Sequence, residues 1–81
     1  MILRDQVWSA CLLQLRKTGK FRLSDLPFNE EQHHTVRRVL REMETMDWLA
    51  RENKRAATWR IGEEAKLHLN VSRDHIKQAW D

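Results

Sequence analysis

The stretch that decides the fold of this chain is NEEQHHTVRRVLREMETM, residues 29–46. Its five apolar positions fall at offsets of 0, 3, 4, 7 and 10, the spacing of one face of an α-helix. They are Val36, Val39, Leu40, Met43 and Met46. Asn29 and Gln32 match the capping box that opens a helix, and Asp47 tolerates the left-handed backbone that closes one. The pattern therefore predicts a helix from Asn29 to about Met46 with one buried stripe.

A second set of residues shares another face of this predicted helix, opposite the apolar stripe. It consists of His34, Arg37, Arg38 and Arg41, at offsets of 0, 3, 4 and 7. Arginine can bridge two acceptors on a guanine edge or hold a phosphate, so this face suits a nucleic-acid partner. The alternative is an ordinary solvated face, on which Glu42 and Glu44 offset part of the charge.

A first helix is predicted from Asp5, which is suited to cap it, to Thr18, with Gly19 as a left-handed stop. Its main apolar face consists of Val7, Trp8, Cys11, Leu12 and Leu15. Leu13 lies on a second apolar side. Either a small core wraps the helix on both sides, or the second side meets another subunit.

The segment between the two helices starts with Lys20–Leu23, where apolar and basic residues alternate as in a brief strand. Ser24 is then predicted to cap a short helix, with Pro27 in its first turn. A basic run free of acids precedes this helix and consists of Arg16, Lys17, Lys20 and Arg22. It could flank a nucleic-acid backbone, but its first two residues also compensate the dipole of the first helix.

Trp48–Glu52 and Thr58–Ile61 are predicted to form two strands joined by a polar, basic hairpin loop at residues 53–57. The residues expected to face the core are Leu49, Trp59 and Ile61. Lys54 and Arg55 stand at the tip of the loop with no acid between them. They either reach a phosphate or the minor groove, or serve only to keep an exposed loop soluble.

The last part of the chain gives a mixed signal. Residues 66–71 alternate partly like a strand, but the acidic first turn after Gly62 favours a helix, which we expect to reach about Asn70. Ser72 then caps a final helix that carries Ile76, Ala79 and Trp80 on one face. This helix either folds back on the domain or, as we favour, packs against a second copy.

The predicted order is helix, short strand, short helix, long helix, two-stranded hairpin, helix and terminal helix. In this order the chain resembles a winged helix-turn-helix DNA-binding domain of bacterial and archaeal transcription regulators. The segments that carry the resemblance are Leu23–Leu26, His34–Met43, Trp48–Arg51 and Thr58–Ala65. It covers roughly residues 5–70 and implies a mainly α fold of the α+β class, with a small β-hairpin wing. We assign residues 1–71 to this domain and 72–81 to a helical extension.

The resemblance implies binding of double-stranded DNA, commonly as a homodimer. The long helix, about residues 29–46, enters the major groove with its amino-terminal part, and the wing, about residues 48–61, contacts the backbone or the minor groove. The candidate DNA-binding residues are Gln32, His33, His34, Thr35, Arg37, Arg38, Arg41, Lys54 and Arg55. The candidate dimer contacts are Leu13, Ile76 and Trp80.

Length and composition argue against several other classes of protein. The chain has 81 residues, 15 of them Lys or Arg and 12 Asp or Glu, which suits one small domain with a net charge of +3. No catalytic constellation, metal-ligand spacing or cofactor motif is visible, so we expect no enzyme activity, no metal, no cofactor and no small-molecule ligand. Cys11 is the only cysteine, and we find no export signal, so we expect a cytoplasmic protein. The sequence has no apolar run of roughly 20 residues, so we expect no membrane partner.

The sequence thus favours a small, sequence-specific transcription regulator that binds double-stranded DNA. One alternative is a winged-helix module for protein–protein assembly, and another is an RNA-binding accessory protein that uses the same basic face. The arginines argue against the assembly module, because the core of a protein interface is depleted in charge. They do not separate DNA from RNA.

Overall fold

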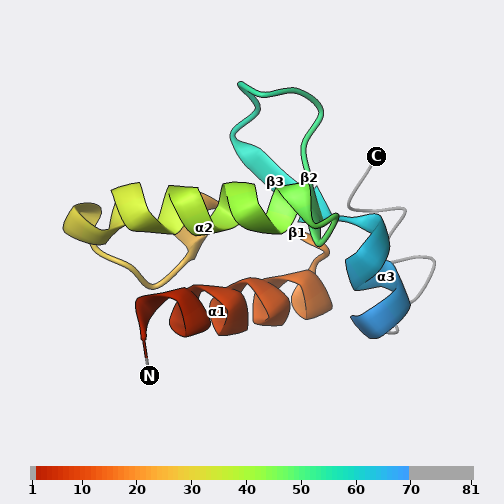
Figure 1. The fold of residues 1–81 in the computed structure, drawn as a ribbon, viewed down its shortest axis with the longest axis horizontal. Helices are drawn as coiled ribbons and strands as arrows, with labels where there is room; N and C mark the ends of the chain where they lie inside the picture. Colours follow the sequence, from red (N-terminus) through yellow and green to blue (C-terminus); the bar gives the residue numbers. More distant parts are fainter. Residues whose placement is uncertain (1, 70–81) are drawn as a thin grey trace.

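The computed structural model describes residues 2–69; the predictions for residues 70 and 71, Ser72, Ile76 and Trp80 lie outside these residues. Within residues 2–69, three α-helices and a small antiparallel sheet form a mixed α+β fold (Figure 1), in the class that the sequence predicts. The elements are α1 (Leu3–Lys17), β1 (Lys20–Arg22), η1 (Leu23–Asp25), η2 (Glu30–Gln32), α2 (His33–Thr45), β2 (Leu49–Ala50), β3 (Thr58–Ile61) and α3 (Glu63–Leu69), where η denotes a 3-10 helix.

The sheet joins the strand after α1 to the hairpin after α2. Its order is β1-β3-β2, and both neighbouring pairs are antiparallel. Phe21 lies opposite Trp59, and Leu49 lies opposite Ile61, so these four side chains face the core. Because successive side chains of a strand point to opposite faces, Arg22 of β1 lies on the outer face of the sheet.

One apolar core fills the space between α1, α2 and the sheet. The buried residues of the two long helices are Val7, Cys11, Leu15, Val36, Val39, Leu40 and Met43, all as predicted. Complete burial of one such aliphatic side chain contributes about 1.5–3 kcal/mol. The prediction for Met46 is wrong: it is 47 % exposed, because α2 ends one residue earlier and the chain turns away from the core.

The start of α1 differs from the prediction. The helix begins at Leu3, and the residue at the cap position, Ile2, makes no side-chain cap hydrogen bond. Asp5 is therefore not the cap but lies in the first turn, where its charge still compensates the helix dipole. Leu3 packs against the core, and this packing favours a helix that starts before the best capping residue.

The predicted short helix after β1 is reduced to the single 3-10 turn η1, so the described part of the chain has one α-helix fewer than expected. Ser24 lies inside this turn instead of capping it. The carboxylate of Asp25 accepts a hydrogen bond of 2.8 Å from the backbone N–H of Arg22. Pro27 follows the turn, and Leu26 is extended before it, since a residue that precedes proline avoids the helical region.

The capping box before α2 is confirmed. The backbone N–H of Asn29 donates to the Gln32 side chain at 3.1 Å, and the backbone N–H of Gln32 donates to the Asn29 side chain at 3.1 Å. The box closes η2 first, however, and the regular α-helix begins only at His33. The predicted helix is therefore right in place, but its first turn is tighter than an α-helix.

Two residues end the long helices in the left-handed conformation that the sequence predicts. Gly19 has φ of 78° after α1, and Asp47 has φ of 63° after α2. Gly62 is required for a different reason: a Cβ atom there would clash with the backbone carbonyl of Asp47. The N–H of Gly62 donates to the Trp48 carbonyl at 3.0 Å, and that of Glu64 to the Asp47 carbonyl at 2.9 Å. These contacts fix α3 against the end of α2.

Candidate nucleic-acid interface

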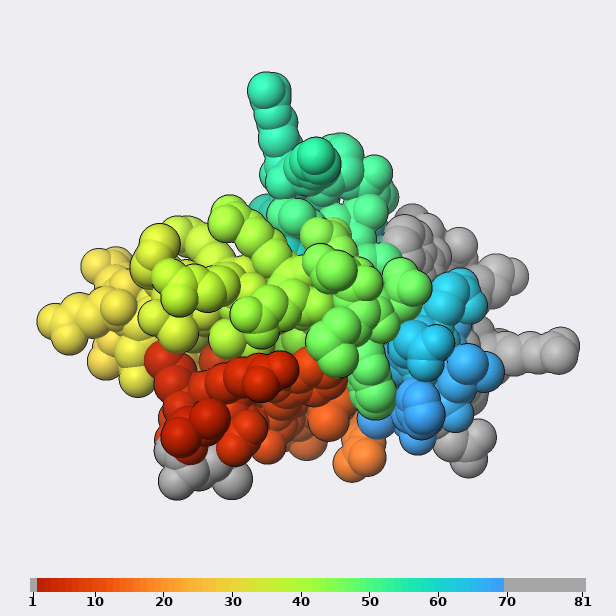
Figure 2. Space-filling model, viewed as in Figure 1, coloured from red at the N-terminus to blue at the C-terminus, as the bar shows by residue number. Residues whose placement is uncertain are grey.

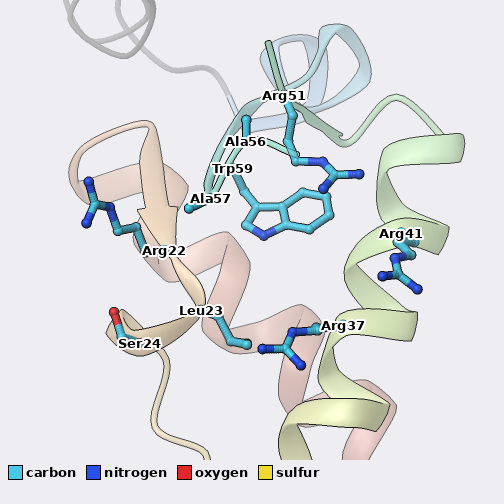
Figure 3. A pocket seen from close by; sticks show the side chains of 9 residues that line it. All are labelled: Arg22, Leu23, Ser24, Arg37, Arg41, Arg51, Ala56, Ala57 and Trp59. Atoms are coloured by element: carbon cyan, nitrogen blue, oxygen red, sulfur yellow. The ribbon is translucent and has the colours of Figure 1, made fainter. Parts of the chain in front are cut away.

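A hollow of about 300 Å³ lies between α2, the start of η1 and the end of the β2–β3 hairpin (Figure 3). We call it the arginine notch. Its lining consists of Arg22, Leu23, Ser24, Arg37, Arg41, Arg51, Ala56, Ala57 and Trp59. Four of these nine residues are arginines, and none is acidic, so the notch is a cationic site on the surface of a small domain.

Two of its arginines are positioned by α2. Arg37 and Arg41 are four residues apart, so they lie one above the other on the same side of the helix. The opposite side is anchored in the core by Val36, Leu40 and Met43, which are fully buried. This burial fixes the rotation of α2 and keeps both guanidinium groups at the surface, where Figure 3 shows them on the side of the helix that borders the notch.

The other two arginines come from the sheet. Arg22 is at the end of β1, and Figure 3 shows it across the notch from α2, with its guanidinium group directed outward, away from the notch. Arg22 also lines a second hollow, on the outer face of the sheet, together with Lys20 and Arg60. One member of the predicted basic run, Arg22, therefore lines the notch, and a second, Lys20, lines the hollow next to it. The sequence does not indicate this proximity, because it depends on the pairing of β1 with β3.

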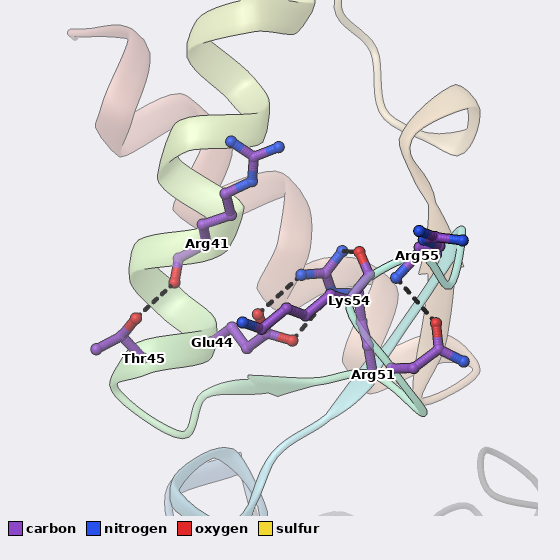
Figure 4. Close-up of polar contacts among 7 residues, drawn as sticks. Arg41, Glu44, Thr45, Arg51, Lys54 and Arg55 are labelled. Atoms are coloured by element: carbon purple, nitrogen blue, oxygen red, sulfur yellow. Dashed lines mark hydrogen bonds and ion pairs between the residues drawn. The ribbon is translucent and has the colours of Figure 1, made fainter.

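Arg51 is a structural residue. Its Nε and Nη2 donate to the two carboxylate oxygens of Glu44, each at 3.0 Å, and its Nη1 donates to the Lys54 carbonyl at 3.0 Å (Figure 4). Its guanidinium carbon lies 4.0 Å from the centre of the Trp59 ring, in a cation–π contact. The Arg51 side chain is only 11 % exposed. It joins α2 to the hairpin, and its charge is already neutralised.

The acids of α2 do not neutralise the remaining arginines. Glu44 is bound to Arg51, and Glu42 faces Arg4 of α1 at 3.7 Å. Within residues 2–69, the guanidinium groups of Arg37, Arg38 and Arg41 make no ion pair or hydrogen bond. These contacts argue against the alternative in which the charges of Glu42 and Glu44 offset those of the arginines on an ordinary solvated face. The exposed side of α2 carries a net positive charge.

The predicted contacts at the start of α2 are largely used within the domain. Gln32 completes the capping box. Nε2 of His33 lies 3.2 Å from the carbonyl oxygen of Phe28, and since a carbonyl only accepts, Nε2 is the protonated nitrogen. Thr35 is half-buried, and His34 is exposed. Of these four residues, His34 is therefore the one that is exposed.

The hairpin loop projects from the body of the molecule, as Figure 2 shows for the teal segment at the top. Lys54 and Arg55 are exposed near its tip, and neither lines the notch. The side chain of Asn53 accepts a hydrogen bond of 2.8 Å from the backbone N–H of Arg55, and its carbonyl accepts one of 3.2 Å from Ala56. Asn53 therefore orders the turn that carries both cations.

The second apolar side of α1 is only partly covered. Leu13 is 53 % exposed, and Ile2 at the start of the helix is 64 % exposed. Single exposed apolar residues are common in soluble proteins. The other two predicted dimer contacts, Ile76 and Trp80, lie outside the described residues. The dimer surface therefore stays a prediction.

Three other features concern redox chemistry, metals and membranes. Cys11 is fully buried between the helices, and burial raises the pKa of its thiol to about 12, which makes it unreactive at neutral pH. In the part of the chain that the structure describes, no group of three His, Cys, Asp or Glu residues is arranged to hold a metal ion. No described helix has both the length and the apolar character needed to cross a membrane.

Comparisons of this chain with protein-family models, with curated proteins and with solved structures give no match.

Proposed function

We propose that this chain is a winged helix-turn-helix domain that binds double-stranded DNA and acts as a small transcription regulator. In this proposal α2 is the recognition helix, the β2–β3 hairpin is the wing, and η1 stands in place of the usual short helix. The observation that carries the proposal is the row of unneutralised arginines on the exposed side of α2. A row of this kind on one helix meets the charge and the groove dimensions of B-DNA.

The contact between α2 and the hairpin supports a single binding surface. Arg51 and Glu44 hold the two elements together through two parallel hydrogen bonds, which fix geometry more strictly than a single one. The hairpin that carries Lys54 and Arg55 is therefore held at its base against the helix that carries Arg37 and Arg41. A preorganised surface loses less conformational entropy on binding than two independent elements would.

The test is a titration of labelled duplex DNA of random sequence over a series of salt concentrations. Wild-type protein should bind, and log affinity should fall with log salt at a slope of about −0.9 for each phosphate that is neutralised. Arg37→Gln/Arg38→Gln removes two cationic contacts and should weaken binding at least about 100-fold.

The matched control is Arg16→Gln/Lys66→Gln, which removes the same charge from α1 and α3, away from the notch. It should retain most of the affinity. Absence of wild-type binding at low salt would refute DNA binding and favour a protein-assembly role. Equal losses in the two double variants would show that charge alone, and no defined face, is responsible.

A further inference from the structure

The arginines of α2 are spread over an arc of about 100° around the helix. Successive residues are about 100° apart around an α-helix, so Arg41 projects about 40° from Arg37, and Arg38 projects about 100° from Arg37 and about 60° from Arg41 on its other side. The lining of the notch divides this arc, because Arg37 and Arg41 belong to it and Arg38 does not. α2 thus presents one pair of arginines toward the hairpin and a separate arginine elsewhere on its exposed side.

The pair beside the notch lacks a counter-charge. Two like charges four residues apart on a helix repel each other, which makes the empty arrangement unfavourable. Glu44, which continues the same row of α2, is held by Arg51, and no acidic residue lines the notch. An anion placed between Arg37 and Arg41 would remove this repulsion and accept hydrogen bonds from both.

The walls of the notch decide which kind of anion fits. Trp59 is only 6 % exposed, and Arg51 covers one face of its ring, so no free indole face is offered to a stacked base. The remaining walls are the small or aliphatic side chains of Leu23, Ser24, Ala56 and Ala57. The site therefore suits a compact, strongly charged group, and the fork of an arginine matches a phosphate.

We propose that the arginine notch holds one phosphate of the DNA backbone between Arg37 and Arg41, with Arg22 at the opposite rim, while Arg38 faces the bases. This assignment rests on the proposed DNA-binding function. When a helix lies in the major groove, its flanks face the phosphates that border the groove and its outermost side faces the base edges. Arg37 and Arg41 line the notch on the hairpin side of α2, and Arg38, on the exposed side of the same helix, does not.

The test uses duplexes of one selected sequence in which a neutral methylphosphonate replaces one backbone phosphate at a time. At one position, the substitution should weaken binding of the wild type about tenfold, as expected for the loss of a charge-assisted contact. At that same position, Arg37→Gln/Arg41→Gln should show almost no further loss, because the contact is already absent. If the losses multiply at every position, no phosphate is held by this pair and the assignment is overturned.

Arg38→Gln serves as the matched comparison, since it removes the same charge from the same helix. Binding by this variant should still weaken at the methylphosphonate position that has no effect on Arg37→Gln/Arg41→Gln. The Arg38→Gln substitution should also reduce the preference for the selected sequence over a scrambled one. Arg37→Gln/Arg41→Gln should instead weaken both sequences by the same factor. The reverse pattern would show that the roles of the arginines are exchanged. Circular dichroism of each variant checks that these surface changes leave the fold intact.

A separate measurement distinguishes failure of this assignment from failure of the proposed function. If the wild type binds no duplex at low salt, inorganic phosphate is titrated while the side-chain N–H signals of Arg37 and Arg41 are followed by NMR. Saturable shifts at both residues, absent for Arg16, would retain the notch as a site for a free phosphate group and remove DNA as its source. Unchanged signals would refute the phosphate site together with DNA binding.

Discussion

The two sides of α2 differ in every physical property. The inner side carries Val36, Leu40 and Met43, each fully buried against α1 and the sheet. The outer side carries Arg37, Arg38 and Arg41, each exposed and without a partner within residues 2–69. The inner side packs inside the domain, whereas the three arginine side chains of the outer side make no ion pair or hydrogen bond within the described residues. Under the proposed function, stability and binding therefore depend on opposite sides of a single helix.

Arg51 shows that this separation depends on surroundings and not on residue type. It is an arginine like the three on α2, but it is largely buried, bound to Glu44 and stacked on Trp59. Its contacts connect the inner core to the outer notch. Substitutions on the inner side should therefore change mainly stability, substitutions at Arg51 should change both stability and binding, and substitutions on the outer side should change mainly binding.

The largest effect is expected on the inner side. Leu40→Ala removes a fully buried side chain and should lower the free energy of unfolding by about 2–5 kcal/mol, from lost burial and the cavity left behind. Urea denaturation followed by tryptophan fluorescence measures the change. The control Arg38→Ala, two residues away on the outer side, should differ from the wild type by less than about 0.5 kcal/mol. Similar losses in both variants would contradict the separation of the two sides.

A smaller effect on stability, combined with an effect on binding, is expected at Arg51. Arg51→Ala leaves Glu44 without its partner and uncovers Trp59, and should lower the free energy of unfolding by about 2 kcal/mol, less than for a completely buried pair because Glu44 is one-third exposed.

The free carboxylate of Glu44 then stands beside Arg41 and should also weaken DNA binding. Adding Glu44→Ala to Arg51→Ala should restore part of that binding. If Arg51→Ala alone retains full stability, the bridge between α2 and the hairpin is not a significant contact.

A pH effect of about 1 kcal/mol is expected at Cys11, on the inner side of the core. Burial raises the pKa of this thiol from 9.0 to about 12, so the unfolded chain loses its thiol proton at a lower pH than the folded one. Stability from this group is complete below pH 9 and decreases as the pH rises from 9 toward 12, with about 1 kcal/mol lost by pH 10. Urea denaturation at pH 8 and pH 10 measures it. Cys11→Ala should show a shallower decrease, and an equal decrease would contradict the shifted pKa.

The smallest effect is expected for the stability of the notch. Arg41→Gln removes one member of a repelling pair and should raise the free energy of unfolding slightly, by about 0.2–0.5 kcal/mol at low salt, with the gain disappearing at high salt. Thermal unfolding at the two salt concentrations measures it. A loss of stability at low salt would show that Arg41 makes an internal contact and is not held free for a ligand.

The local parts of the fold could be read from the sequence. The apolar spacing of α2, the reciprocal bonds of Asn29 and Gln32 and the left-handed stops at Gly19 and Asp47 agree with the structure. The helical reading of residues 66–69 also agrees. Each of these features depends on residues within about one turn of each other, so the sequence contains all the atoms that decide it.

The errors occur where packing overrides a local preference. Asp5 and Ser24 are good capping residues, but α1 begins earlier, at Leu3, and the turn η1 encloses Ser24. Met46 continues the apolar spacing of α2, but the helix ends before it. In each case the place where the helix or turn begins or ends depends on residues of another element, or on the geometry of a turn. The residue type alone does not determine either.

By itself, the sequence located the three α-helices, the three strands, the inner stripe of α2 as far as Met43 and the set of arginines opposite that stripe, because periodicity alone assigns residues to the faces of a helix. It also predicted a further short helix, where the structure has only the turn η1. Only the tertiary structure decided which arginines are free. Pairing of β1 with β3 brings Arg22 to the notch, and the turn after α2 brings Arg51 onto Glu44. The physical reason is that the effective charge of an arginine depends on its distance to a carboxylate, and that distance is set by the whole fold.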